Sequence, residues 1–289
     1  MSSNQNSVLI LGANGQLGSD LVQVFLQQAL DFVALTRAEF DLSKDDVAKL
    51  GDYAPQYVIN CIATTNVDGC EDDPDATFAT NSVFVYNLAK FCNVHNITLL
   101  HISTDYVFNG RRSMPYTETD QPQPLNIYGL SKYTGELAIQ AYHDKYFILR
   151  VSSLFGKAGA SGKGGNFVTT MLRLGRERDR VEVVADQITC PTATLDIARC
   201  ISYVIQHKIV DYGIYNCVSQ NSCSWFDFTR EIFKLAHLDV EKVHPAEFSK
   251  YKFKAKRPQY GVLDTTKLAK YYSMPAWQTS LAEYITAIT

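Results

Sequence analysis

Three glycines spaced three residues apart follow a short apolar run near the start of the chain, and this segment constrains the fold more than any other. The run Val8-Leu9-Ile10-Leu11 is wholly aliphatic, as in a strand buried on both faces, and apolar residues recur at helical spacing after the glycines. Glycines allow a tight turn and bring backbone amides close to a pyrophosphate at the start of a helix. The segment therefore predicts a strand, a turn and a helix that bind a dinucleotide, with the spacing GxxGxxG instead of GxGxxG. The expected cofactor-binding residues here are Gly12, Asn14, Gly15, Gln16, Leu17 and Gly18.

The next 140 or so residues alternate between apolar runs and helical patterns, and an alternating order of this kind is typical of a parallel sheet covered by helices. Strands are expected at residues 32–36, 57–60, 97–104 and 146–150, with a long helix at 74–94 and another that starts near Tyr128. We therefore predict an α/β fold with a doubly wound parallel sheet of the Rossmann type. Residues 1–150 are expected to form the dinucleotide-binding domain, with a returning segment at about 186–210. Residues 151–185 and 211–289 are expected to form a smaller substrate-binding domain.

The end of the second strand bears on the choice of cofactor. Thr36-Arg37 stands where an NAD-selective fold often carries an acidic residue for the ribose hydroxyls. Arg37 is instead suited to a 2′-phosphate, which favours NADPH but leaves NADH open. Asp41 and Leu42 are expected to border the adenine, and the small Ala63 leaves room for cofactor at a strand end.

Tyr128 and Lys132 are four residues apart, so one helix places both side chains on the same face. A lysine ammonium beside a tyrosine favours the phenolate and is expected to draw the tyrosine pKa down toward neutral pH. The hydroxyls of Ser103 and Thr104 stand at the end of the preceding strand and are expected to face the cofactor. His101 lies inside the same apolar strand and is interpreted as a packed core histidine.

Composition narrows the range of partners. A net charge of -3 gives no broad attraction for nucleic acid or an anionic membrane, and the seven cysteines are scattered without metal-ligand spacing. Basic and aromatic residues alternate at 250–258, but in a slightly acidic chain a loop that offers one cation to a diphosphate is favoured over an RNA surface. The cysteine spacing leads us to expect no bound metal. The scattered cysteines suit a reducing compartment and residues 1–7 lack the plan of a signal peptide, so we expect a cytoplasmic protein.

Taken together, the motifs resemble those of the extended short-chain dehydrogenase/reductase superfamily and, more closely, of the dTDP-4-dehydrorhamnose reductase family. The resemblance runs nearly end to end. It rests on the segments 12–18, 65–68, 103–108, 128–136, 149–150, 166–167, 186–187, 191–192, 224–225 and 257–258.

The resemblance implies NAD(P)H-dependent reduction of the C4 ketone of a 4-keto-6-deoxy sugar nucleotide, most simply dTDP-4-dehydro-L-rhamnose to dTDP-L-rhamnose. It implies that Tyr128 protonates the ketone oxygen, that Lys132 tunes Tyr128 and holds the nicotinamide ribose, and that Thr104 orients the carbonyl. Thr65 is expected to contact both cofactor and sugar. The full set of expected substrate-binding residues is Thr65, Val67, Thr104, Asp105, Tyr106, Ser153, Asn166, Gln187 and Arg257.

Several alternatives stay open. The family commonly has Thr-Ser-Trp after Leu-Arg, whereas this chain has Val151-Ser152-Ser153, so a related 4-keto-hexose nucleotide is an alternative substrate. A 4,6-dehydratase would need a glutamate where Tyr106 stands. An epimerase uses the same tyrosine and lysine, and a non-catalytic binder similar to the regulatory beta subunit of methionine adenosyltransferase keeps much of the same sequence. A homodimer is possible, but the acidic residues that bind magnesium between subunits in some members have no match here.

Overall fold

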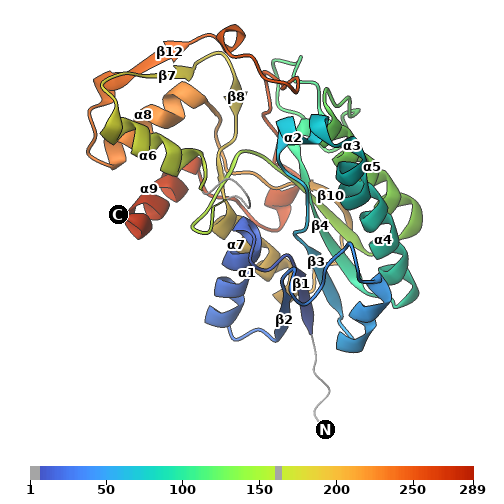
Figure 1. Cartoon of the computed structure of the whole chain (residues 1–289). Helices are drawn as coiled ribbons and strands as arrows, with labels where there is room; N and C mark the ends of the chain where they lie inside the picture. The colour runs from blue at the N-terminus through green and yellow to red at the C-terminus, as the bar shows by residue number, and fades with distance from the viewer. Residues whose placement is uncertain (1–6, 160–164) are drawn as a thin grey trace.

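A six-stranded parallel sheet forms the centre of the larger part of the molecule (Figure 1), in a computed structural model that describes residues 7–159 and 165–289. Its strand order is β10-β5-β4-β3-β1-β2, and each strand pairs in parallel with its neighbours. The strands are β1 (Val8–Leu11), β2 (Phe32–Leu35), β3 (Tyr57–Asn60), β4 (Thr98–Thr104), β5 (Tyr146–Val151) and β10 (Gly213–Asn216). The predicted doubly wound α/β fold is confirmed.

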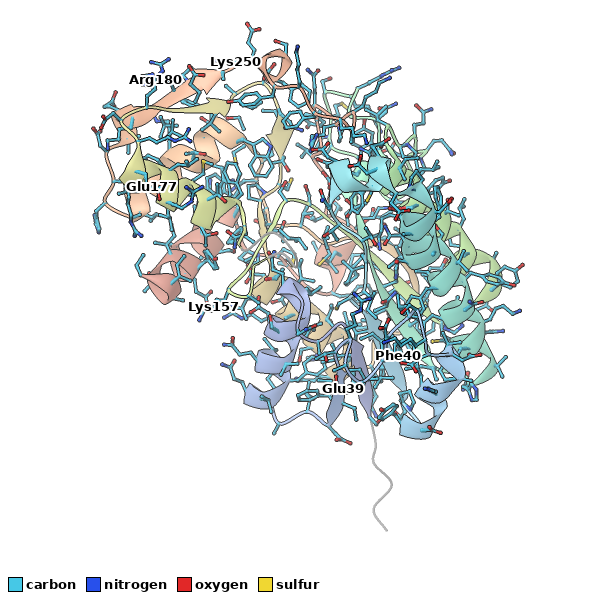
Figure 2. All side chains as sticks on the ribbon, in the orientation of Figure 1. Glu39, Phe40, Lys157, Glu177, Arg180 and Lys250 are labelled. Carbon is cyan, nitrogen blue, oxygen red and sulfur yellow. The ribbon has the colours of Figure 1, made fainter. Side chains whose placement is uncertain are left out.

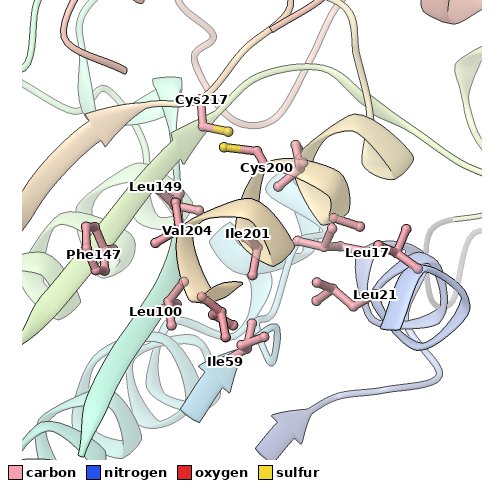
Figure 3. Packing of buried hydrophobic residues seen from close by; sticks show 14 of the residues in the cluster. Leu17, Leu21, Ile59, Leu100, Phe147, Leu149, Cys200, Ile201, Val204 and Cys217 are labelled. Carbon is pink, nitrogen blue, oxygen red and sulfur yellow. The ribbon is translucent and has the colours of Figure 1, made fainter. Parts of the chain in front are cut away.

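Helices cover both faces of this sheet, which explains why its strands are continuously apolar. Alternate residues of β1 enter two separate cores: Val8 and Ile10 face α1 (Gln16–Gln27) and α7 (Thr194–Gln206), while Leu9 and Leu11 face α4 (Phe84–Val94) and α5 (Ile127–Tyr142). Figure 3 shows the first core, where side chains of α1 and α7 meet those of β3, β4 and β5. The site below lies at the carboxyl ends of these strands.

The long helix expected at 74–94 is present with an irregular middle. It starts as α3 (Pro74–Phe78), with proline in the first turn and an Asp73 side chain that accepts the amide of Ala76. It then widens into a π-helical segment (Ala79–Val83) and continues as α4. The short helix α2 (Val67–Asp72) precedes it. No local residue pattern distinguishes the widened turn.

The second lobe packs around a separate apolar cluster that includes Phe155, Phe228 and Trp277. Its elements are α6 (Phe167–Glu177), α8 (Trp225–Leu235), α9 (Trp277–Ile288) and the parallel pair β7 (Val181–Val184) and β12 (Val243–Ala246). The short strands β6 (Leu154–Phe155) and β9 (Thr192–Ala193) form one further pair, and β8 (Ile188–Thr189) and β11 (Cys223–Ser224) form another. Single 3₁₀ segments occupy Val47–Tyr53, Asp105–Val107, Val240–Lys242, Phe248–Lys250 and Leu268–Lys270. Figure 2 places Arg180 and Lys250 at the end of this lobe that lies farthest from Glu39 and Phe40, which follow β2 of the large sheet.

The chain crosses between the lobes more than once. Helix α7, in the expected returning segment, packs on α1 beside the large sheet. Strand β10 lies in the range that the sequence analysis assigned to the smaller domain, yet it pairs with β5 at the edge of the large sheet. A four-residue strand after a loop gives no sign of which sheet it joins, because register and partner are set by tertiary packing.

Within residues 7–159 and 165–289, no helix is both long and apolar enough to cross a membrane. The same residues contain no cluster of three or more His, Cys, Asp or Glu side chains arranged to hold a metal ion.

Candidate active site

The glycine turn after β1 is built for close backbone contact. Gly12 has a φ of 77°, a conformation that side chains disfavour, and its amide donates to the carbonyl of Leu35 at 2.9 Å. A Cβ on Gly18 would lie 2.2 Å from the carbonyl oxygen of Gly12, so α1 packs directly against the turn. Gly15 is the N-cap of α1 and makes no side-chain cap. The first amides of α1 therefore stay available for an anionic ligand.

A cleft of about 1250 Å³ opens beside this turn. It is larger than a typical small-molecule pocket of about 300–1,000 Å³, as a dinucleotide requires. The expected cofactor residues that line it are Gly12, Asn14, Gly15, Arg37, Asp41, Leu42 and Ala63. The glycine turn, the cleft and the basic rim described next together fit a phosphorylated dinucleotide.

Some expected cofactor residues lie outside this lining. Leu17 is buried in the core, and Gly18 lets α1 pack against the glycine turn. Neither residue therefore lines the cleft. Gln16 is half-buried at the start of α1. Thr64 lines the cleft, whereas its neighbour Thr65 is exposed to solvent.

The rim at the end of β2 carries a cation beside an anion. Arg37 is 81% exposed, and its Nε lies 3.5 Å from a carboxylate oxygen of Asp41. Hydrogen bonds from the amide and hydroxyl of Ser43 lower the pKa of Asp41 to about 2, with Arg37 and Lys44 acting in the same direction. Asp41 is therefore ionised at neutral pH, and Arg37 keeps most of its surface free for a phosphate.

Thr104 and Tyr128 meet at the carboxyl end of β4. Thr104 is buried there, and its hydroxyl hydrogen-bonds the phenol of Tyr128 from the first turn of α5. The ring of Tyr106 stands edge-on to that of Tyr128, with centroids 5.7 Å apart. Burial raises the pKa of Tyr128 above its ordinary value, and the Thr104 bond acts against that rise. Tyr128 is thus a protonated phenol at neutral pH and has a proton to give.

Lys132 is almost fully buried one turn further along α5, and its partners differ from those expected. Its Nζ donates to the carbonyl of Ile102 at 2.6 Å and lies 3.2 Å from Nε2 of His101. Burial lowers the pKa of Lys132 to about 8. Lys132 was expected to lower the pKa of Tyr128. Instead, burial of the phenol dominates and raises that pKa. His101 is buried as expected, but it contacts polar groups on both sides.

Helix α5 is fixed to the sheet by a buried ion pair. Nε and Nη2 of Arg150 on β5 bind the two oxygens of Glu136 on α5 at 3.0 and 2.6 Å. The hydroxyl of Ser103 donates to the same carboxylate. At the other end, the side chain of Asn126 accepts the amide of Gly129 at 2.7 Å and caps the helix. These contacts set the position of Tyr128 and Lys132 against β4.

Asn81 is a positioning residue that sequence reasoning missed. Its side chain accepts the amide of Thr64 at 2.9 Å and donates to the carbonyl of Thr64 and the hydroxyl of Ser131, both at 3.0 Å. It therefore ties the loop after β3 to α5 from within the π-helical segment. Its partners are 17 and 50 residues away in sequence, so no local motif marks it.

Two further expected substrate residues, Asp105 and Tyr106, lie beside Thr104. Burial raises the pKa of Asp105 to about 7, while hydrogen bonds from Ser152 and Thr104 oppose the rise. The hydroxyl of Tyr106 hydrogen-bonds Arg257.

Arg257 links this site to a second cleft of about 760 Å³, which is lined by residues 109–112 of the larger lobe and by residues of the smaller lobe. Its guanidinium binds Asp68 of α2 at 2.8 and 3.1 Å and stacks over the ring of Phe253 at 3.9 Å. Arg111, Arg112 and Lys256 add further cations to the lining of this cleft. Arginine and aromatic side chains together suit a nucleotide diphosphate.

Other expected substrate residues form hydrogen bonds with other parts of the protein. Nδ2 of Asn166 donates to Gly156 and Tyr284, and its Oδ1 caps α6. Gln187 donates to the carbonyl of Pro258 and accepts from Trp225, so it fastens the loop that carries Arg257. Ser153 bonds the hydroxyl of Thr189. Asn166 and Gln187 have the right chemistry for a diphosphate, but their polar atoms are already paired by the fold.

Two further expected residues precede α2. Thr65 is exposed, and Val67 begins the helix half-buried.

A dinucleotide cleft and a buried tyrosine at the adjacent strand end define the class: this is an oxidoreductase with a nicotinamide-type cofactor site. The chain belongs to the RmlD substrate binding domain family, whose model matches residues 6–289. The dTDP-4-dehydrorhamnose reductase of Aggregatibacter actinomycetemcomitans is 37% identical over 288 residues, which cover 95% of this chain and 96% of that protein.

Solved structures agree with this membership. A dTDP-4-dehydrorhamnose reductase from Clostridium acetobutylicum superposes with a TM-score of 0.90 at 36% identity, covering 98% of this chain and 99% of that one. The dTDP-4-dehydrorhamnose reductase of Bacillus anthracis, solved in complex with NADP, gives the same TM-score, identity and coverage.

Proposed function

We propose that the protein reduces the C4 ketone of a 4-keto-6-deoxy sugar nucleotide with NADPH, converting dTDP-4-dehydro-L-rhamnose or a close analogue to the 4-hydroxy sugar. The observation that carries the proposal is the protonated phenol of Tyr128, hydrogen-bonded to Thr104 at the carboxyl end of β4. Family membership supports the same reaction.

NADPH fits the larger cleft by the chemistry of its lining. The free amides at the start of α1 suit the pyrophosphate, and the exposed guanidinium of Arg37 suits the 2′-phosphate. Asp41 and Leu42 border the space for the adenine. When bound, NADPH supplies the hydride for the reduction.

The protein's own residues supply the proton and hold the ketone. Tyr128 hydrogen-bonds the ketone oxygen and gives up its phenolic proton as negative charge develops there. The resulting phenolate is stabilised by the Thr104 hydroxyl, which lowers the tyrosine pKa. We propose that the ammonium form of Lys132, one helical turn away, adds to this stabilisation during the reaction. Thr104 therefore acts both on the ketone and on the acid that serves it.

We place the nucleotide end of the substrate in the second cleft. Arg257 is the best candidate for the diphosphate, because it lies at this cleft and hydrogen-bonds Tyr106, whose ring contacts that of Tyr128. The aromatic side chains of Phe248, Tyr251 and Phe253 suit stacking with a base. The division into a dinucleotide-binding and a substrate-binding domain is part of this proposal.

The test is to incubate the purified protein with NADPH and a panel of 4-keto sugar nucleotides, following NADPH absorbance and identifying the products. Consumption of NADPH with one reduced sugar formed per NADPH supports the proposal. Isomerisation of a sugar nucleotide without net NADPH loss would assign an epimerase. Binding of NADPH without turnover of any panel member would assign a regulatory binding protein. Light scattering of the same sample tests the homodimer, which stays a prediction.

A further inference from the structure

Three buried polar side chains form a row behind the catalytic helix, and the reaction described above leaves two of them without a role. Asn60 on β3, His101 on β4 and Lys132 on α5 are each at most 1% exposed. Asn60 and His101 sit opposite one another in the parallel pairing of β3 and β4. Nδ2 of Asn60 lies 3.1 Å from Nδ1 of His101, and Nε2 of His101 lies 3.2 Å from Nζ of Lys132.

A backbone amide fixes the direction of this row. The amide of Ile62 donates to Oδ1 of Asn60 at 3.1 Å, so the side-chain oxygen faces the backbone and the NH₂ group faces His101. An amide NH₂ is only a donor, so Nδ1 of His101 must accept and carries no proton. In a neutral imidazole the proton then sits on Nε2 and points at Lys132.

Such an imidazole N–H needs a lone pair to receive it. An ammonium has three donors and no acceptor, whereas a neutral lysine amine has one lone pair. Nζ already donates to the carbonyl of Ile102 at 2.6 Å. Every bond in the row is satisfied only when Lys132 is a neutral amine that accepts from His101.

We propose that Asn60 and His101 favour the neutral amine form of Lys132 in the free enzyme and so set the pH range in which its ammonium form is available to Tyr128. His101 is then a positioning residue that acts through Lys132. The catalytic part of this inference rests on the proposed reduction, whereas the protonation state of the row does not.

The other groups that face Lys132 agree with this assignment. From its own helix, Glu136 favours the ammonium, but that carboxylate is already bound by Arg150 and Ser103. Beyond β3, burial raises the pKa of Cys61 to about 12, so this thiol is uncharged. Burial of Lys132 itself lowers its pKa to about 8. An imidazole N–H that points at Nζ also disfavours the ammonium form.

The first test is nitrogen NMR of the protein labelled in its histidines, without cofactor, near neutral pH. The chain has six histidines, and loss of one signal in His101→Gln assigns the right one. We expect a neutral ring with its proton on Nε2. A proton on Nδ1, or a doubly protonated ring, would overturn the inference. His143→Gln, at a buried histidine on the C-cap of α5, is the matched control and should leave the His101 signal unchanged.

The second test uses Asn60→Asp to reverse the direction of the hydrogen bonds along the row. A carboxylate accepts from Nδ1–H, which frees the Nε2 lone pair to accept from a lysine ammonium. We expect the His101 proton to move to Nδ1 and the alkaline limb of kcat to shift upward by about one pH unit, with KM largely kept. The double variant His101→Phe with Asn60→Asp keeps the new charge and removes the ring. An equal shift in that variant would show that charge alone acts and would reject the role of His101. If the wild type reduces no sugar nucleotide, the proposed function fails while the NMR result still decides the state of the row.

Discussion

Tyr128 is a phenol on which two effects act in opposite directions. Burial raises its pKa, and the hydrogen bond from Thr104 lowers it. A phenol with a raised pKa holds its proton until the ketone oxygen becomes basic, which suits an acid in a reduction. Lys132 is proposed to stabilise the phenolate of Tyr128 only as an ammonium. Because burial lowers the pKa of Lys132 to about 8, this ammonium form is lost as the pH rises past about 8.

Arg37 gives a direct prediction for cofactor choice. Arg37→Ala should weaken NADPH binding by about tenfold or more and leave NADH binding nearly unchanged, because a charge-assisted bond to a phosphate contributes roughly 1.5–3 kcal/mol. Fluorescence titration with both cofactors measures this. Equal losses for NADPH and NADH would remove Arg37 from the phosphate site.

Asp105 gives a prediction for stability as a function of pH. Burial raises its pKa from 3.8 to about 7, so its contribution to folding is complete below pH 4 and is lost as pH rises to 7. Relative to Asp105→Asn, the wild type should lose about 3 kcal/mol of unfolding free energy between roughly pH 5 and pH 8. Urea unfolding at both pH values measures the difference. Stability curves that run parallel for the two proteins would contradict the assigned burial.

Among the secondary-structure elements, α5 carries the chemistry, and its attachment is electrostatic as well as apolar. Glu136 and Arg150 are 0% and 1% exposed. Removing one partner of such a pair leaves an uncompensated buried charge, which typically costs 3–5 kcal/mol. Glu136→Ala should therefore lower the unfolding free energy by about that amount in a urea titration.

The matched control is Glu177→Ala, which breaks the Arg173–Glu177 pair on the surface of α6. Both side chains are more than half exposed, and such pairs contribute roughly 0–1 kcal/mol. A loss in Glu136→Ala no larger than in this control would show that the buried pair does not anchor α5.

The sequence predicted the elements of the large sheet well where local pattern decides the structure. The mainly apolar runs at β1, β3 and β5 and the glycine turn are recognisable in the sequence, because burial on both faces of a sheet and a tight turn each require particular residue types. The widened turn at Ala79–Val83 and the placement of β10 depend on contacts with distant segments. Local pattern carries no information about either.

At the scale of the whole molecule, the two lobes are connected by the loop that contains Lys254 and Arg257. Arg257 and Lys254 of this loop pair with Asp68 and Asp72 of α2 in the large lobe. The loop also lines the second cleft. Its position therefore decides how the nucleotide end of a substrate is held while its sugar lies at Tyr128.

Arg257→Ala should raise KM for the sugar nucleotide by about tenfold or more and change kcat less, because it removes binding that is equal in ground and transition states. Lys250→Ala is the control: Lys250 pairs with Glu182 within the small lobe, away from α2. Steady-state kinetics of both variants measures the contrast. The same KM in the two variants would place the diphosphate elsewhere.

The site could be predicted from the sequence only where a local residue pattern marks it. The spacing of Tyr128 and Lys132 and the hydroxyl of Thr104 are visible in the sequence, and the structure brings Thr104 and Tyr128 into contact. The bonds from Lys132 to Ile102, from Gln187 to Pro258 and from Asn166 to Tyr284 join residues 30, 71 and 118 positions apart. Spacing along the chain does not reveal such contacts.

The most direct test of the account compares turnover and NADPH affinity in the wild type and in Tyr128→Phe, which removes one hydroxyl and keeps the ring. General acid catalysis is typically worth about 10²–10⁴-fold, so we predict that kcat falls by about 100-fold or more while NADPH affinity stays within about twofold. Turnover equal to that of the wild type would contradict the assignment of Tyr128 as the proton donor.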